Sequence, residues 1–319
     1  MPSSASSRAD ERSVLVAVLT YQRPDDLVEL LPLLLDQARP GVDLLVVDND
    51  PAGAAASTVA SFAGVRYVHE PRPGIAAARN RALTEGDGHD LLVFIDDDER
   101  PSEGWLAALL LTFDAHAASG VVGPVISAFA APLDPWVAAG GFFTRRRMPT
   151  GSPVTVAATN NLLLDLKAVR AAGVRFDERL GLSGGSDTLF TRQLVDRAGP
   201  LVWCDEAVVT DVVPAGRTTR DWVVRRQFRS GNSWSRTALM LTDSGVQRFR
   251  LRLSLTAKGG VRLIGGPASW LLGALTGNVR RRAVGVKATA RGLGMLVGAY
   301  GFSYIEYRRP VPAADALIR

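Results

Sequence analysis

The stretch Leu91-Leu92-Val93-Phe94-Ile95-Asp96-Asp97-Asp98 joins five apolar residues directly to three aspartates. Such an apolar run predicts a buried strand of a parallel sheet, with the aspartates at its carboxyl end. Open α/β sheets bind their ligands at that edge. Adjacent like charges repel one another unless a cation compensates them, and Mg²⁺ or Mn²⁺ prefers carboxylate oxygens. The stretch therefore indicates a metal-assisted site; the alternative is a solvated turn, with Asp98 or Ser102 capping a helix.

Strand-like and helix-like segments alternate around this stretch. Buried-strand patterns occur at 14–20, 44–47 and 65–69, and helical spacing of apolar residues occurs at 25–37 and 75–83. This order predicts the βαβ rhythm of a parallel sheet. No glycine-rich dinucleotide fingerprint or P-loop follows the first strand, so a metal and basic side chains would have to hold any nucleotide diphosphate.

Composition places the chain among soluble enzymes. Its 319 residues suffice for one large domain or two modest ones. The single cysteine, Cys204, excludes an intramolecular disulfide and fits a reducing compartment. Residues 1–12 lack an apolar signal region, so we expect a disordered lead-in and a cytoplasmic protein.

Charge is divided unevenly along the chain. Residues 1–214 hold 18 Lys/Arg and 28 Asp/Glu, whereas residues 215–319 hold 19 and 4. A segment as basic as the second should seek phosphates on a nucleotide, a nucleic acid or an anionic membrane. Its arginines alternate with aliphatic residues, not stacking aromatics, and we therefore expect no nucleic-acid partner.

Seven sequence segments between about Val14 and Trp234 resemble, in order, the family 2 glycosyltransferases. They are VLTYQRPDDL, VVDND, GIAAARNRAL, FIDDDERP, TNNLLLDLKAVRAAGVRFDERLG, GGSDTLF and RRQFRSGNS. The resemblance implies the GT-A fold, an α/β architecture with a mixed sheet flanked by helices, and inverting transfer from a nucleotide sugar. It divides the chain into residues 13–235, with donor-binding (13–125) and acceptor-binding (126–235) halves, and a helical basic region, 236–319.

The resemblance also assigns a nucleoside pocket. Thr20, Tyr21 and Arg23 at the end of the first strand would form it with Asp48 and Asp50, since carboxylates and backbone groups can hydrogen-bond to a base edge. UDP is favoured and dTDP is the alternative. For the two aspartates an Asx turn that closes the strand is the competing interpretation.

The diphosphate and its metal would lie beside this pocket. Arg79 would approach the base or a phosphate, unless it is a surface cation. Asp96 is assigned to the ribose side and Asp98 to the metal, because alternate residues of an extended segment face the same way. Asp97 faces elsewhere and is grouped with the donor-binding residues. Asp211 stands where related enzymes often have a metal-binding histidine, and a surface turn is its alternative.

The reaction and the acceptor are assigned to the second half of the domain. Asp187 is the expected general base, near the start of a helix at 188–197; the alternative is a simple N-cap. The family commonly has Glu-Asp where this chain has Ser186-Asp187. Asn160, Asn161 and Trp136 are the expected acceptor-binding residues, although an Asn pair is also common in turns.

A basic helix beginning near Asp221 completes the predicted site. Arg225, Arg226 and Arg229 share one face by their spacing, and Arg226 and Arg229 would clamp the donor diphosphate. Gly231 would end this helix, which could instead present a solvated basic face.

Beyond Trp234 the resemblance fades. The apolar windows at 263–279 and 292–305 are short and glycine-rich for membrane spans. They predict amphipathic helices at an anionic membrane surface; a helical subdomain or homodimer surface is the alternative.

The expected function is therefore inverting, Mg²⁺- or Mn²⁺-dependent transfer of a sugar to a hydroxyl. The acceptor would be a lipid-linked glycan or, alternatively, a secondary-metabolite aglycone. A non-catalytic nucleotide-sugar-binding or membrane-associated scaffold is the competing class.

Overall fold

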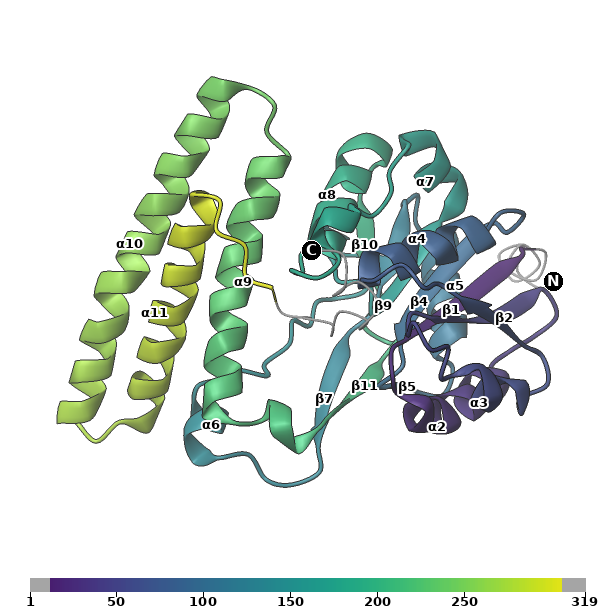
Figure 1. The fold of residues 1–319 in the computed structure, drawn as a ribbon, viewed down its shortest axis with the longest axis horizontal. Coiled ribbons are helices and arrows are strands. Elements are labelled where there is room, and N and C mark those ends of the chain that lie inside the picture. The colour runs from purple at the N-terminus through teal and green to yellow at the C-terminus, as the bar shows by residue number, and fades with distance from the viewer. Residues whose placement is uncertain (1–11, 306–319) are drawn as a thin grey trace, which may run out of the picture.

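The computed structural model describes residues 12–305, so almost all of the predicted lead-in and the last 14 residues of the basic region lie outside the described residues. It shows a mixed α/β domain with a layer of long helices on one side (Figure 1). The strands are β1 (Val14–Thr20), β2 (Val42–Asp48), β3 (Val65–His69), β4 (Leu91–Asp96), β5 (Glu99–Pro101), β6 (Gly120–Val122), β7 (Val125–Phe129), β8 (Pro153–Val154), β9 (Asn161–Asp165), β10 (Leu201–Trp203) and β11 (Val209–Val213). The α-helices are α2 (Pro24–Leu35), α3 (Ala56–Ala60), α4 (Ile75–Glu85), α5 (Trp105–Ala115), α6 (Pro135–Ala139), α7 (Leu166–Ala172), α8 (Ser186–Ala198), α9 (Arg220–Met240), α10 (Gly245–Leu275) and α11 (Val279–Ala299).

The main sheet has eight strands in the order β3-β2-β1-β4-β9-β6-β10-β8. β1 is parallel to both β2 and β4, as the βαβ rhythm predicts. β9 enters between β4 and β6 and is antiparallel to both, so the sheet is mixed, as the family resemblance implied. The parallel sheet that the sequence predicts is therefore observed in β3-β2-β1-β4, and β9 interrupts it.

Helices cover both faces of this sheet, and each face has its own apolar core. Even-numbered residues of β1 pack toward α2 and α5, whereas its odd-numbered residues pack toward α4 and α8. Every residue of β1 is buried because alternate side chains of a strand point to opposite faces. This two-sided burial fixes the position of the strand ends that carry the polar residues.

A second, three-stranded sheet lies directly after the aspartates. β11 pairs antiparallel with β5 and parallel with β7. The register sets Asp211 opposite Glu99, and the backbone N–H of Val212 donates to the carbonyl of Asp98. Carboxylates more than 100 residues apart in sequence are thereby brought together.

Close contacts through glycine hold the helical layer together. α11 lies between α9 and α10 (Figure 1). On α10, Gly259, Gly266 and Gly273 recur every seven residues and face α11, where Gly285 and Gly292 face back. A Cβ at any of these positions would meet the neighbouring helix within 3.0 Å, so the two backbones approach as closely as small residues allow.

Glycines also set the contact between α9 and α11, and they correct the predicted helix end. A Cβ on Gly231 would overlap the carbonyl of Arg291, and one on Gly294 would overlap the carbonyl of Phe228. Gly231 therefore lies inside a helix that continues to Met240, because packing outweighs its low helix propensity. The predicted boundary at 235/236 falls inside this helix. Within 12–305, no helix is long and apolar enough to cross a membrane.

Gly294→Ala should lower the free energy of unfolding by about 1–3 kcal/mol, because the added methyl overlaps the α9 backbone. Gly260→Ala on α10 is the matched control: its Cβ would enter open space, so helix propensity should stabilise the protein by up to about 1 kcal/mol. Urea denaturation measures both. Equal effects of the two substitutions would contradict the close-packed description.

Candidate active site at the carboxyl edge of the sheet

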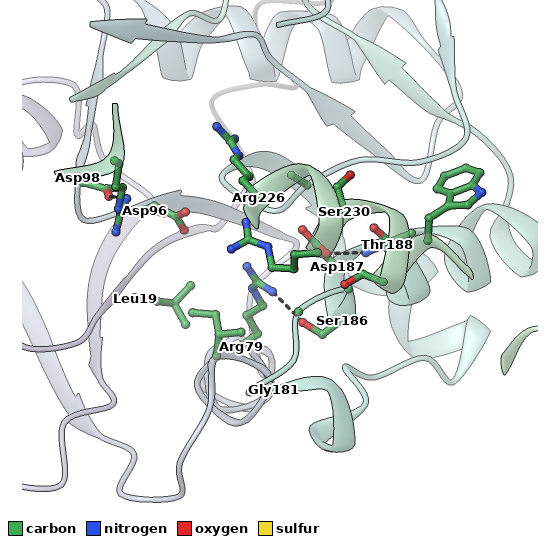
Figure 2. A pocket seen from close by; sticks show the side chains of 18 of the residues that line it. Leu19, Arg79, Asp96, Asp98, Gly181, Ser186, Asp187, Thr188, Arg226 and Ser230 are labelled. Carbon is green, nitrogen blue, oxygen red and sulfur yellow. Dashed lines mark hydrogen bonds and ion pairs between the residues drawn. The ribbon is translucent and has the colours of Figure 1, made fainter. Parts of the chain in front are cut away.

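A cavity of about 910 Å³ opens at the carboxyl ends of β1 and β4 and extends to α8, α9 and α11 (Figure 2). An adjoining cavity of about 490 Å³ shares Asp96, Asp98 and Asp187 with it and adds Glu99 and Asp211. The structure therefore gathers residues from the predicted donor-binding and acceptor-binding halves around one space.

The end of β1 forms one wall of the larger cavity. Thr20, Tyr21 and Arg23 line it, as does Asn49 from the loop after β2. The Thr20 hydroxyl donates to Asp97 at 2.8 Å and is thus oriented by the triplet itself. Three of the five residues assigned to the nucleoside pocket thus line this cavity.

Asp48 and Asp50, the other two, do not line either cavity, and we correct their assignment. The Asp48 carboxylate accepts the backbone N–H groups of Asp50 and Ala55, each at 2.9 Å, and the Tyr67 hydroxyl at 3.2 Å. Asp48 is fully buried, and burial together with this carboxylate raises the pKa of Tyr67 to about 12. Asp50 is buried as well. The Asx-turn interpretation is the one observed at Asp48, and Asn49, itself 2% exposed, is the residue of this loop that lines the larger cavity.

The three aspartates after β4 have different surroundings. Asp97 is 4% exposed and lines only the larger cavity; it accepts from Arg23 at 2.8 Å, and burial raises the pKa of its carboxyl to about 6. Asp98 pairs with Arg23 at 2.7 Å and with Arg217 at 3.1 Å. Asp96 and Asp98 both line both cavities, as their alternate positions predict. Arg23, just after β1, and Arg217, just after β11, thus compensate the charge of the triplet.

Glu99, a fourth acid that directly follows the triplet, was not among the predicted site residues. Its carboxylate accepts the backbone N–H of Asp96 at 3.1 Å and the side-chain amide of Asn160 at 2.7 Å. Burial, followed by repulsion from Asp96, raises its pKa well above the ordinary value. Burial likewise raises the pKa of Asp96 to about 7. The sequence signal that could have identified Glu99 is the unbroken run of four acids, DDDE.

This cluster of carboxylates has the chemistry of a Mg²⁺ or Mn²⁺ site, but it does not provide a complete set of ligands. Asp96, Asp98 and Asp211 offer oxygen ligands at the smaller cavity, although Asp211 is paired with Arg145 at 2.7 Å. No three acidic, histidine or cysteine side chains in residues 12–305 converge closely enough to hold an ion alone. Mg²⁺ commonly uses one or two carboxylates and completes its shell with substrate phosphates and water. The residues fit a site that the donor completes.

Asp187 is the second residue of α8 and lines both cavities (Figure 2). The helix N-cap is Gly185, in the left-handed region at φ 96°, so Asp187 is not the N-cap that was its alternative. Its carboxylate accepts the backbone N–H of Thr188 at 2.7 Å.

Ser186, which replaces the acid common in the family, contacts Arg79. The Arg79 guanidinium donates to the Ser186 hydroxyl at 3.0 Å and lies 5.5 Å from the centre of the Phe176 ring. Arg79 is 7% exposed and lines both cavities, so the surface-cation interpretation is wrong. One buried nitrogen, Nε, has no hydrogen-bond partner. The serine is a neutral partner for Arg79, and the Asp96 carboxyl is the acid whose pKa Arg79 lowers electrostatically.

The arginines of α9 divide between the cavity and the surface. Arg226 and Arg229 line both cavities, whereas Arg225 pairs with exposed Asp221 at 2.8 Å. The Arg226 guanidinium lies 5.3 Å from the centre of the Trp222 ring. Burial, then repulsion from Arg145 and Arg229, lowers the pKa of Arg226 to about 10. A solvated basic face thus describes Arg225 but not its neighbours.

The expected acceptor-binding residues are only partly at the site. Asn160 lines the smaller cavity. Asn161 is 1% exposed, donates to the carbonyls of Pro124 and Ala207, and accepts the Trp105 indole N–H at 2.9 Å. Its amide is used entirely in holding strands and α5 together, so its assignment is corrected.

Trp136 is also corrected. It is 7% exposed, stacks on Phe142 at 5.2 Å between ring centroids, and lines neither cavity. Phe142 reaches the larger cavity in its place. Other cavity residues lie outside the quoted motifs and had no local sequence signal: Arg217, Trp234, Lys287 and Arg291. Gln227, Ser230 and Ser233 also line the cavity; they belong to the segment RRQFRSGNS but were not singled out.

The family profile described as Glycosyl transferase family 2 matches residues 15–171. The succinoglycan biosynthesis protein ExoM of Rhizobium meliloti (strain 1021) is 32% identical over 228 residues, covering 69% of this chain and 74% of ExoM. This chain belongs to the family 2 glycosyltransferases. It is a nucleotide-sugar-dependent glycosyltransferase, and the family resemblance seen in its sequence is confirmed.

Solved structures confirm the GT-A fold. S. aureus TarS 1–349 in complex with UDP-GlcNAc matches with a TM-score of 0.50 and 15% identity, over 85% of this chain and 89% of TarS. GalNAc-T7 with UDP, GalNAc and Mn²⁺ matches with a TM-score of 0.51 and 11% identity, over 73% of this chain and 52% of GalNAc-T7. At such identities the likeness extends to the fold alone.

The raised pKa values of Asp96 and Glu99 predict how stability depends on pH. Above about pH 5 the unfolded chain has released these protons, because an ordinary Asp has a pKa near 3.9. The folded chain keeps the proton of Asp96 up to about pH 7 and therefore binds more protons in this window. Stability should then fall as pH rises from 5 to 7.5. Carboxyls whose pKa is lowered in the folded protein, such as Asp134, instead make stability rise with pH, but that rise is complete at lower pH.

Melting temperatures in EDTA across pH 5–7.5 measure this effect. Asp96→Asn should flatten the profile, whereas Asp25→Asn, at an exposed carboxylate on α2, should leave it unchanged. A profile for Asp96→Asn that matches the unmodified protein would contradict the burial of this group.

Proposed function

We propose that this glycosyltransferase is inverting and metal-dependent, and that it uses a UDP-sugar, with a dTDP-sugar as the alternative donor. The observation that carries the proposal is the placement of Asp187 across one cavity from the carboxylates of β4, with cationic side chains lining the same space. One space would thereby supply a general base, carboxylates for a metal and cations for a diphosphate.

The donor would lie along the β1 and β4 ends. Thr20, Tyr21 and Arg23 would contact the nucleoside, and Asp96 the ribose. Asp98, with Asp211 beside it, would hold Mg²⁺ or Mn²⁺. When bound, the metal acts as a Lewis acid on the donor diphosphate.

Arginines would bind the same diphosphate from the other side. Arg226 and Arg229 on α9 and Arg79 on α4 all line both cavities, so all three can face one anionic group. The unpartnered Nε of Arg79 would gain a hydrogen bond, and the repulsion of Arg226 by Arg145 and Arg229 would be relieved, when phosphate oxygens accept their N–H groups. Fixed cations around a leaving group stabilise the charge that develops in the transition state.

Asp187 would act as the general base. Its carboxylate takes the proton of the acceptor hydroxyl as that oxygen bonds to the anomeric carbon. The bond from this carbon to the phosphate oxygen breaks on the opposite face, and the electron pair leaves with the nucleoside diphosphate. The anomeric configuration inverts as a result. Asn160, beside Glu99, and Trp234 lie where an acceptor sugar would contact protein.

The proposed acceptor is a growing cell-envelope or extracellular glycan, carried on a lipid at the cytoplasmic face of the membrane. The identity to ExoM, whose name places it in succinoglycan biosynthesis, supports a polysaccharide acceptor. A small secondary-metabolite aglycone is the alternative acceptor. A non-catalytic nucleotide-sugar-binding protein is the alternative class, and substitution of Asp187 separates it from an enzyme.

Asp187→Asn should lower the rate of nucleoside diphosphate release from the preferred donor by about 100-fold or more, because general-base catalysis contributes about 10²–10⁴-fold. Water can serve as the acceptor while the natural one is sought. UDP-glucose, UDP-galactose, UDP-GlcNAc and dTDP-glucose are tested with Mn²⁺. The donor KM should change little, since Asp187 is proposed to contact the acceptor.

Asp196→Asn is the matched control, because Asp196 lies on α8 with an exposed side chain. It should retain full activity. Equal turnover by Asp187→Asn and the unmodified enzyme would exclude Asp187 as the base. No turnover with any donor, together with no binding of any nucleotide, would favour the non-catalytic alternative.

A further inference from the structure

The outer face of α10 carries a continuous apolar stripe. Its large members are Val246, Phe249, Leu253, Ile264, Leu271 and Leu275, and each is more than half exposed. Small residues Ala257, Gly260 and Ala268 fill the gaps at helical spacing. At 100° per residue all of these side chains lie within about one third of the helix circumference. The stripe runs the length of a helix that is about 45 Å long.

This stripe is not part of the helical core. The opposite side of α10 packs on α11 through Leu255, Gly259, Gly266 and Gly273, all of which are buried. α10 is also the outermost element of the helical layer, and α9 and α11 separate it from the sheet (Figure 1). The exposed face therefore points away from the catalytic domain, and none of the residues in 12–305 covers it. Exposed apolar patches of this extent usually mark a binding surface.

The charge around the stripe has one sign. From Ser244 to Ile305 the chain has ten Lys/Arg and no Asp or Glu; Lys287 and Arg291 line the active-site cavity, and the other eight lie on α10 or at the start of α11. The clusters Arg248, Arg250 and Arg252 lie near the beginning of α10, and Arg280 to Arg282 follow its end. Within the described residues none of the ten has a carboxylate ion-pair partner; the ion pairs of the protein lie elsewhere. The region around the stripe is thus positive without compensation.

We propose that the outer face of α10 docks on an anionic membrane surface, with the apolar stripe in the headgroup region and the flanking arginines on lipid phosphates. An amphipathic helix with a basic flank binds in the plane of the interface and does not cross the bilayer. A second copy of this chain is a poorer occupant, because pairing two such faces would bring two sets of uncompensated cations together. Lipid phosphates supply the missing negative charge.

Docking by this face sets the height of the active site. α11 packs on α10 and lines the near wall of the cavity, whereas the proposed base Asp187 is on α8, beyond α9. Packed helix axes are 8–10 Å apart, so Asp187 would stand about 20 Å or more from the docked helix. An acceptor carried on a lipid would then have to present its reacting hydroxyl at that height. This geometry favours a glycan already extended from its lipid over a sugar attached directly to it.

Vesicle flotation of the full chain tests the proposal independently of catalysis. Vesicles of phosphatidylcholine with 30% phosphatidylglycerol should bind the protein, and pure phosphatidylcholine vesicles should bind at least tenfold less. The triple variant Phe249→Ser, Ile264→Ser, Leu271→Ser should bind anionic vesicles at least tenfold more weakly, with an unchanged melting temperature because these side chains are exposed.

Val28→Ser, Leu111→Ser is the matched control, since both side chains are exposed on the catalytic domain, and it should bind normally. Arg250→Gln, Arg252→Gln should weaken binding to anionic vesicles without loss of fold. The proposal is overturned if the unmodified protein fails to bind anionic vesicles, or if the folded triple variant binds as well as the unmodified protein. Sedimentation showing a dimer that the triple variant abolishes, without vesicle binding, would assign the face to a second copy.

Discussion

Four consecutive acids at the end of one buried strand create the constraint on which this structure depends. Asp96, Asp97, Asp98 and Glu99 are largely removed from water, where like charges repel strongly and each ionised group costs free energy. The protein meets this cost in two ways. Arg23 and Arg217 pair with the second and third acids. The first and fourth have raised pKa values and are protonated more readily.

The rest of the fold positions partners for these acids. Arg23 follows the carboxyl end of β1, at the edge of the sheet where β4 also ends. β11 pairs with β5, and this register places Asp211 opposite Glu99. α9 lies on the far side of the cavity and contributes Arg226 and Arg229, whose own mutual repulsion is relieved by an anion. A metal diphosphate complex would satisfy both sides at once: its cation meets the acids and its oxygens meet the arginines. The site is therefore poised for a ligand that contains both charges.

Sequence reasoning succeeded where a local pattern determines structure. The apolar run before Asp96 determines a buried strand, and alternation along an extended chain explains why Asp96 and Asp98 line both cavities whereas Asp97, held by Thr20 and Arg23, lines only the larger one. The same reasoning failed where residue type is ambiguous. An aspartate after a strand can bind a ligand or accept a backbone N–H that closes a turn, and Asp48 does the second. Asn160 and Asn161 are identical in type, yet only the first reaches a cavity, because β9 buries the second.

Long-range packing was also beyond the local patterns. Gly231 normally favours the end of a helix, but close contact with α11 keeps it inside α9. The antiparallel insertion of β9 depends on pairing with β4, which is about 70 residues away in sequence. Lys287 and Arg291 reach the cavity only because glycines let α11 approach α9. These features depend on which segments meet, and no window of the sequence contains both partners.

The central claim is that the acids after β4 bind the donor diphosphate through a divalent cation. Calorimetric titration of UDP into the protein in Mn²⁺ and in EDTA tests it most directly, with Asp98→Asn as the variant and Asp205→Asn, at a surface ion pair with Arg147, as the control. We expect UDP to bind at least tenfold more tightly in Mn²⁺, and this gain to be lost in Asp98→Asn but retained in Asp205→Asn. Equal affinity with and without Mn²⁺, or an undiminished gain in a folded Asp98→Asn protein, would contradict the account.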